Sequence, residues 1–142
     1  MKISAPLIIA STLALAVTSG CAMFHGDRAH VMDTPCMTAS GAVCVITIKV
    51  ESCQRITAHP EHARVADNDR GDIEWRVEPG NWSFTDQGID FKYPHSDFSN
   101  RRNMKSAYKW HNAHTVKNKR HPYAIEVTDG KQTCRKDPSI MN

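Results

Sequence analysis

The chain contains 142 residues, with 18 Lys or Arg against 15 Asp or Glu, and its formal net charge at pH 7 is +3. Without residues 1–20 the balance falls to 17 bases against the same 15 acids, a net of +2. This near-balance gives no electrostatic argument for a highly charged partner such as nucleic acid, and the length suffices for one domain with one core.

The chain begins with an apolar segment. Lys2 supplies a positive charge, residues 3–17 are mostly apolar, and small residues lead to Cys21. The run is shorter than the ~20 residues that span a bilayer, which predicts a secretory signal peptide over residues 1–20. Its ending, T-S-G-C, resembles the lipobox of bacterial lipoproteins, although Thr18 stands where leucine is usual. We therefore expect cleavage before Cys21 and lipidation of that residue.

A lipid on Cys21 would anchor the chain to a membrane. Ala22, in place of aspartate, favours transport to the periplasmic face of the outer membrane. Residues 21–40 show no apolar periodicity and predict a flexible tether with a reach of roughly 25 Å. The alternative is an ordinary signal peptide cut nearby, which would leave Cys21 as a spare thiol.

Residues 41–142 carry the period-two alternation of β-strands. The first strand is expected over residues 43–50, where β-branched side chains alternate between two faces. Residues 73–84 are expected to form a hairpin, because the turn pair Pro79-Gly80 separates two alternating runs.

Further strands are expected at residues 89–91, 108–116 and 123–127, and Asp129-Gly130 predicts a second hairpin. Together these elements predict an all-β fold, an antiparallel β-sandwich of about seven strands or a small barrel. The expected core consists of large apolar residues on the alternating faces: Ile46, Ile48, Trp75, Trp82, Phe84, Phe91, Trp110, Ile125 and Val127.

Four cysteines follow the signal segment: Cys36, Cys44, Cys53 and Cys134. An even number in an exported chain predicts two disulfides. If the first expected strand forms, Cys44 and Cys53 lie ~20–30 Å apart, beyond the ~7 Å that a disulfide tolerates. We prefer Cys36–Cys44 with Cys53–Cys134, because a glycine allows the short loop to turn back. The pairing Cys36–Cys53 with Cys44–Cys134 stays open.

The chain carries no common catalytic motif. It has no G-x-S-x-G, P-loop, H-E-x-x-H or Gly-rich dinucleotide turn. The expected disulfides remove thiolate nucleophiles, and the carboxylates are scattered singly. We therefore expect no enzyme and no cofactor, but a binding or structural role.

A periplasmic copper- or zinc-binding protein is the first alternative. The tether region holds six soft donors within fifteen residues: Met23, His25, His30, Met32, Cys36 and Met37. A flexible tether lacks fixed geometry, however, and Cys36 is expected in a disulfide. Two H-x-x-H pairs occur as well, and this spacing chelates on a helix but not on a strand. His59 and His62 could open a helical turn, whereas His111 and His114 fall in an expected strand, so we assign no metal site.

A basic stretch suggests the second alternative, a binder of an anionic envelope polymer or of a partner protein. Residues 98–125 contain no acid and seven bases: Arg101, Arg102, Lys105, Lys109, Lys117, Lys119 and Arg120. Residues 61–97 contain nine acids and four bases. The alternative reading is two solvated faces, or two complementary segments that lie side by side.

The stretches I-E-W-R-V-E-P-G-N-W-S-F-T-D-Q-G-I-D-F, Y-K-W-H-N-A-H and C-R-K-D-P-S-I-M-N resemble a group of small bacterial exported proteins. The resemblance covers roughly residues 43–142. It implies a cupredoxin-like or immunoglobulin-like β-sandwich with Cys134 tied to an earlier cysteine, and it implies no activity. A blue-copper site is not expected, because no histidine lies between Cys134 and Met141. We expect a lipid-anchored, non-catalytic envelope protein.

Overall fold

Strands make up the regular secondary structure of residues 32–39, 41–93 and 96–142, which a computed structural model describes. The expected signal peptide and Cys21 lie outside the described residues. Within the described residues no helix is present, and therefore none that could cross a membrane. The strands belong to one unit that begins at Val31.

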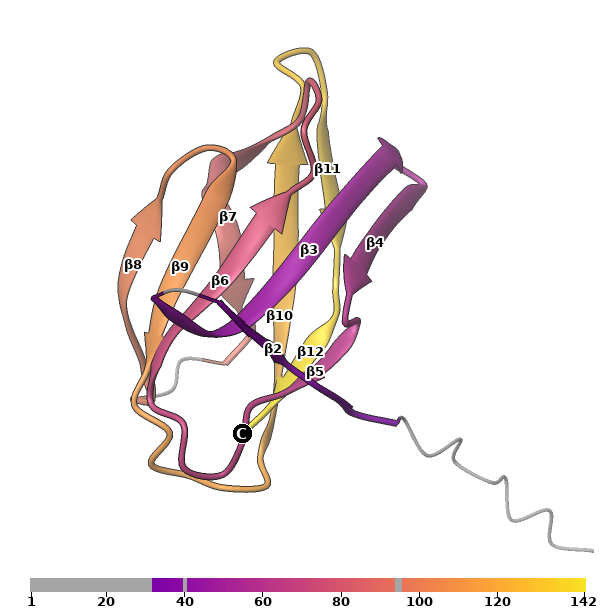
Figure 1. Cartoon of the computed structure of the whole chain (residues 1–142). Helices are drawn as coiled ribbons and strands as arrows, with labels where there is room; N and C mark the ends of the chain where they lie inside the picture. Colours follow the sequence, from indigo (N-terminus) through magenta and orange to yellow (C-terminus); the bar gives the residue numbers. More distant parts are fainter. Residues whose placement is uncertain (1–31, 40, 94–95) are drawn as a thin grey trace, which may run out of the picture. The chain divides into compact units, whose positions relative to one another are not determined.

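The first sheet is centred on β3 (Ala42–Ser52), the longest strand (Figure 1). β6 (Gly71–Val77) pairs with it in parallel, and β9 (Ala107–Asn112) and β8 (Phe98–Asn103) follow in antiparallel order. β2 (Met37–Ala39) and β4 (Arg55–His59) pair with different stretches of β3.

The second sheet is centred on β10 (Arg120–Thr128). It pairs in antiparallel fashion with β7 (Ser83–Phe91), β11 (Thr133–Lys136) and β12 (Ser139–Met141). β5 (His62–Arg64) joins β12 in parallel, and β1 (Thr34–Pro35) joins β5 in parallel. The two sheets pack together as the predicted β-sandwich, although both sheets are mixed rather than purely antiparallel and the strand segments outnumber the seven expected.

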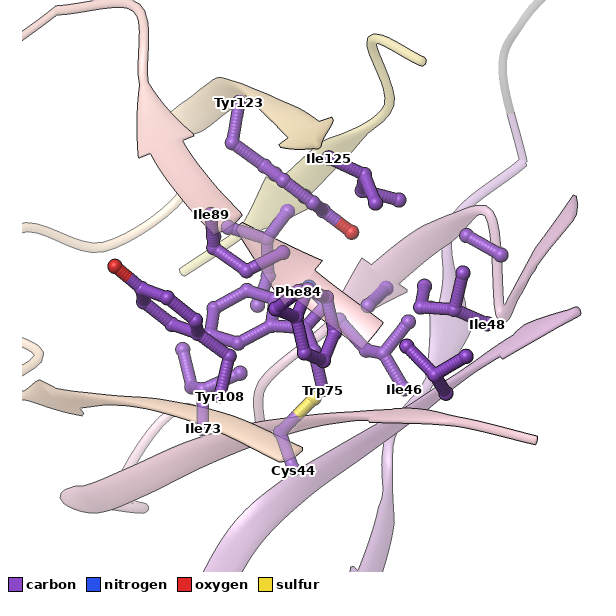
Figure 2. Packing of buried hydrophobic residues seen from close by; sticks show 14 of the residues in the cluster. Cys44, Ile46, Ile48, Ile73, Trp75, Phe84, Ile89, Tyr108, Tyr123 and Ile125 are labelled. Atoms are coloured by element: carbon purple, nitrogen blue, oxygen red, sulfur yellow. The ribbon is translucent and has the colours of Figure 1, made fainter. Parts of the chain in front are cut away.

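The core lies between the sheets and is rich in aromatic rings (Figure 2). The ring centroids of Trp75 and Tyr123 are 5.3 Å apart in an edge-to-face arrangement, a favoured geometry for aromatic pairs. Six of the nine expected core residues are buried: Ile46, Ile48, Trp75, Phe84, Ile125 and Val127. Trp82, Phe91 and Trp110 are only half-buried and pack against the edge of this cluster.

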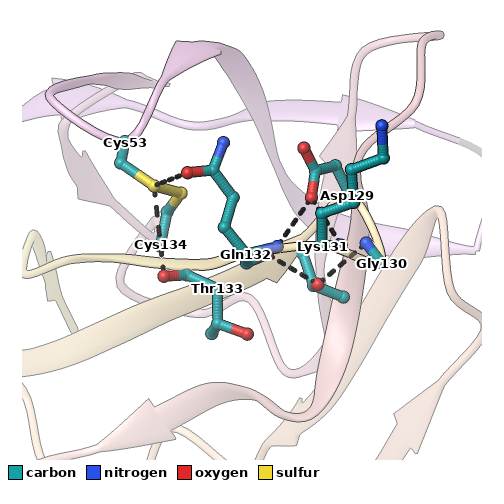
Figure 3. Close-up of a disulfide and its surroundings, with 8 residues drawn as sticks. Cys53, Asp129, Gly130, Lys131, Gln132, Thr133 and Cys134 are labelled. Atoms are coloured by element: carbon teal, nitrogen blue, oxygen red, sulfur yellow. Dashed lines mark hydrogen bonds between the residues drawn. A yellow bond between two sulfur atoms is a disulfide. The ribbon is translucent and has the colours of Figure 1, made fainter.

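The two disulfides are Cys36–Cys44 and Cys53–Cys134, the pairing that we preferred. Cys36–Cys44 joins the segment between β1 and β2 to the start of β3. Cys53–Cys134 joins the β3–β4 turn to β11 and therefore links the two sheets (Figure 3). The Asp129-Gly130 hairpin is also confirmed, because β10 and β11 pair on either side of it. The Asp129 carboxylate accepts hydrogen bonds from the backbone amides of Lys131 and Gln132.

Two expectations were wrong for reasons that local sequence does not carry. The predicted hairpin over residues 73–84 does not form, because β6 pairs with β3 and β9 while β7 pairs with β10. The Pro79-Gly80 turn instead carries the chain from one sheet to the other. The expected tether also ends early, since β1 and β2 hydrogen-bond to β5 and β3.

Candidate functional site

The seven basic residues of the sequence prediction do not form one patch. Arg101, Arg102 and Lys109 lie on β8 and β9, and Lys105 lies in the turn that joins these strands at one end of the sandwich. Lys117 and Lys119 lie in the loop after β9, at the opposite end (Figure 1). The stretch is continuous in sequence, but it extends along the whole sandwich.

Three of the seven bases are paired with acids. Lys109 Nζ lies 3.0 Å from Glu74 Oε2, Arg120 Nη2 lies 2.6 Å from Asp33 Oδ1, and Arg102 Nη2 contacts Asp72 Oδ2. The first pair follows from strand pairing, because antiparallel β9 sets Lys109 opposite Glu74 of β6. The Arg102–Asp72 pair joins β8 to β6, which lie on either side of β9. Of the two alternatives, the arrangement on β6, β9 and β8 fits complementary segments that lie side by side, because bases of β8 and β9 pair with acids of β6.

The two histidines of each H-x-x-H pair have different surroundings. His59 is exposed at the end of β4, whereas His62 Nδ1 lies 3.0 Å from Ser139 Oγ. His111 Nδ1 lies 3.4 Å from Asp72 Oδ1, and His114 is buried with Nδ1 3.0 Å from the Asp69 carbonyl oxygen. The helical turn considered for the first pair is a strand, β5.

The structure describes only three of the six donors that we considered in the tether, Met32, Cys36 and Met37. Met23, His25 and His30 lie outside the described residues. Met32 and Met37 are exposed, and Cys36 is in a disulfide. In the described ranges, no group of three or more His, Cys, Asp or Glu side chains is placed to hold a metal ion.

A groove of about 620 Å³ lies where the chain crosses between the sheets. It is lined by residues of β3 and β6, of the crossing segment, of the turn before β9, and of the start of β9: Thr47, Glu74, Arg76, Val77, Glu78, Pro79, Gly80, Trp82, Ser106 and Ala107. Its volume falls within the ≈ 300–1,000 Å³ usual for small-molecule sites. We therefore take it as the candidate binding site.

Backbone hydrogen bonds hold the rim of this groove in place. The Val77 amide donates to the Ser106 carbonyl oxygen at 2.9 Å, and the Glu78 amide donates to the Ile48 carbonyl oxygen at 2.8 Å. On the far side of the crossing, the Phe84 amide donates to the Lys105 carbonyl oxygen at 2.7 Å. The crossing segment is thus attached to β3 and to the β8–β9 turn, which makes the groove a preformed feature.

The floor of the groove is charged. Glu74 and Arg76 alternate with inward-facing residues of β6, so both side chains point to the outer face of the sheet. Glu74 is only 6% exposed, yet Arg76 Nε lies 2.6 Å from its Oε1 and Lys109 binds its other oxygen. The hydrogen bond from Arg76 is the main reason that the pKa of Glu74 is lowered, while burial opposes the shift. Glu74 is therefore an anion at neutral pH.

The sequence reasoning missed this groove because it assigned Trp82 to the core and Pro79-Gly80 to a hairpin. A signal was present: two glutamates and an arginine, Glu74, Glu78 and Arg76, directly precede that turn pair in the sequence. The sequence could not show that a third segment, the turn before β9, completes the wall.

A second polar cluster fastens the N-terminal segment. Arg120 Nη1 donates to Ser139 Oγ at 2.9 Å, and the same guanidinium binds Asp33 just before β1. His62 holds the Ser139 hydroxyl from β5. Ser139 is buried, and its contacts join three strands, β5, β10 and β12, which identifies the cluster as a structural clamp.

Sequence comparisons do not extend these observations. No protein-family model matches the chain, and no curated protein matches it. The geometry of the described residues is therefore the basis for inferring a function.

Proposed function

We propose that this protein is a non-catalytic binding protein of a bacterial envelope, anchored through a lipid on Cys21. Its binding surface is the groove at the β6–β7 crossing, and its partner is an envelope polymer or protein. The anchor places the domain on the periplasmic face of a membrane, with the outer membrane favoured by Ala22.

The position of the groove within the domain carries this proposal. The described chain enters the sandwich at one end, beside β1 and β5, and the crossing between β6 and β7 lies at the opposite end (Figure 1). The groove therefore lies at the end of the sandwich opposite to the one where the described chain enters it. The Asp33–Arg120 pair and the Cys36–Cys44 disulfide fix the entry point to the domain.

The disulfides support export. Cys53–Cys134 and Cys36–Cys44 use every cysteine of the described residues, and disulfides persist in oxidising compartments rather than in the bacterial cytoplasm. Cys21, which would be unpaired, is the residue that the lipobox resemblance selects for lipidation.

Labelling of cells with a tritiated fatty acid tests the anchor. The wild-type protein should be labelled and should fractionate with membranes, whereas Cys21→Ser should be unlabelled and released into the periplasm. Unlabelled wild-type protein in the cytoplasm with reduced thiols would contradict the proposal.

Site-specific photocrosslinking in living cells tests the groove. A crosslinking amino acid at Asn81, on the exposed crossing segment, should yield discrete adducts. The same amino acid at Val116, exposed at the opposite end, serves as the matched control. Equal adduct patterns at the two positions would show that the groove is not the binding surface.

A further inference from the structure

We propose that the groove beside Trp82 binds a neutral saccharide, as in a glycan chain of the envelope. This inference rests on the proposed binding function and names the chemistry of its ligand. It is carried by the balance of charge in the groove, by the hydrogen-bonding groups left open there, and by the aromatic wall.

The charge balance disfavours a ligand of high net charge. Glu74 and Glu78 line the groove with Arg76, and Lys109, which is not among the lining residues, forms an ion pair with Glu74. An anionic polymer would meet the exposed carboxylate of Glu78, and a cationic one would meet the guanidinium of Arg76. A ligand without net charge avoids both repulsions.

The open polar groups suit a ligand rich in hydroxyls. Arg76 uses its Nε to hold Glu74, and within the described chain its terminal nitrogens have no hydrogen-bond partner. These nitrogens carry four N–H donors in a planar array. Glu78 supplies acceptor oxygens, and the Thr47 and Ser106 hydroxyls can donate or accept. Vicinal sugar hydroxyls, which also both donate and accept, can satisfy all four groups.

The apolar wall suits a sugar ring. A pyranose has a face of C–H groups as well as its rim of hydroxyls, and it therefore needs an apolar surface next to polar ones. Trp82 is half-buried and lines the groove together with Val77, Pro79 and Ala107. An extended proline-rich peptide is the competing occupant, because such peptides dock in aromatic-lined grooves. The charged pair at the floor favours the saccharide over that peptide.

Calorimetric titration of the full-length lipoprotein tests the ligand class, in a detergent without a sugar headgroup. The probes are the tetramer of N-acetylglucosamine, maltotetraose and a proline-rich decapeptide. We expect saturable binding of at least one of the two saccharides. Arg76→Gln and Glu78→Gln should each weaken that binding about tenfold, the loss expected for one hydrogen bond to a charged group.

Matched controls separate the groove from general effects. Arg55→Gln removes another arginine that binds a glutamate, Glu51, where β3 and β4 meet at their turn, and should leave affinity within about twofold. Trp82→Phe should weaken binding, whereas Trp110→Phe replaces another half-buried tryptophan, one that does not line the groove, and should leave binding unchanged.

Each outcome decides the inference. Saccharide binding that all variants retain equally would overturn it, because the ligand would then sit elsewhere. Binding of the peptide alone, lost in Arg76→Gln, would overturn the ligand class and leave the groove as the binding surface. Absence of saccharide binding overturns the inference, and equal crosslinking at Asn81 and Val116 would in addition overturn the proposed function.

Discussion

The two disulfides should contribute unequally to stability, and the difference can be worked from the chain. Cys53–Cys134 spans 81 residues and Cys36–Cys44 spans 8. In the chain-entropy model, closing a loop of n residues lowers the entropy of the unfolded state by about 2.1 + 1.5R ln n cal/mol/K. At 25 °C this gives about 4.5 kcal/mol for the long loop and about 2.5 kcal/mol for the short one.

The two pairs are well matched for a comparison. Each consists of one buried cysteine, Cys44 or Cys134, and one half-buried cysteine. Truncation to alanine therefore removes a similar amount of packing in both pairs, and that loss cancels in the difference. The two loops do not overlap in the sequence, so their contributions should add.

Urea unfolding followed by tryptophan fluorescence measures the difference. The double variant C53A/C134A should lose about 2 kcal/mol more unfolding free energy than C36A/C44A. It should also show the larger increase in m-value, because its unfolded state gains more exposed surface. Equal losses, or a larger loss for C36A/C44A, would refute the loop-entropy reasoning.

Three further predictions concern single side chains. The pKa of Glu74 is lowered in the folded state, so its contribution to stability is complete above the ordinary value of 4.5 and is lost as the pH falls through the folded-state pKa. Glu74→Gln should therefore lower the free energy of unfolding at pH 7 by about 1–3 kcal/mol. It should also flatten the acid limb of a curve of Tm against pH. An unchanged acid limb would show that another carboxyl group controls it. Gly88→Ala should lower Tm by several degrees, because Gly88 has φ +29° and a Cβ there would overlap the Tyr108 ring. Gly80→Ala should leave Tm nearly unchanged, because its Cβ would meet only the Glu78 carbonyl oxygen, at 3.9 Å. Equal Tm values for the two alanine variants would contradict this packing. Asp97→Asn should lower the free energy of unfolding by about 1–3 kcal/mol and speed hydrogen exchange of the backbone amides in the loop after β9. The reason is that the buried carboxylate of Asp97 accepts hydrogen bonds from two amides of that loop. Exchange rates that stay at the wild-type level in this variant would argue against this role.

The sequence alone determined the features that are local. Alternation along β3 and β6 predicted which side chains face the core, because successive side chains of a strand point to opposite faces. Asp129-Gly130 predicted its hairpin through the preferences of those two residues. Strand geometry also excluded the pairing that contains Cys44–Cys53, which left two pairings.

The choice of strand partners depends on contacts between distant parts of the chain. Pro79-Gly80 permits either a hairpin or a crossing between sheets, and the choice depends on which neighbours β6 and β7 find: β3 and β9 for one, β10 for the other. The same pairing brought the bases of β8 and β9 beside the acids of β6. It also built the groove from three segments that are distant in the sequence. Strand pairing is a non-local choice because the backbone groups of every strand are alike, so the groove followed from the folded arrangement and not from any one stretch of the chain.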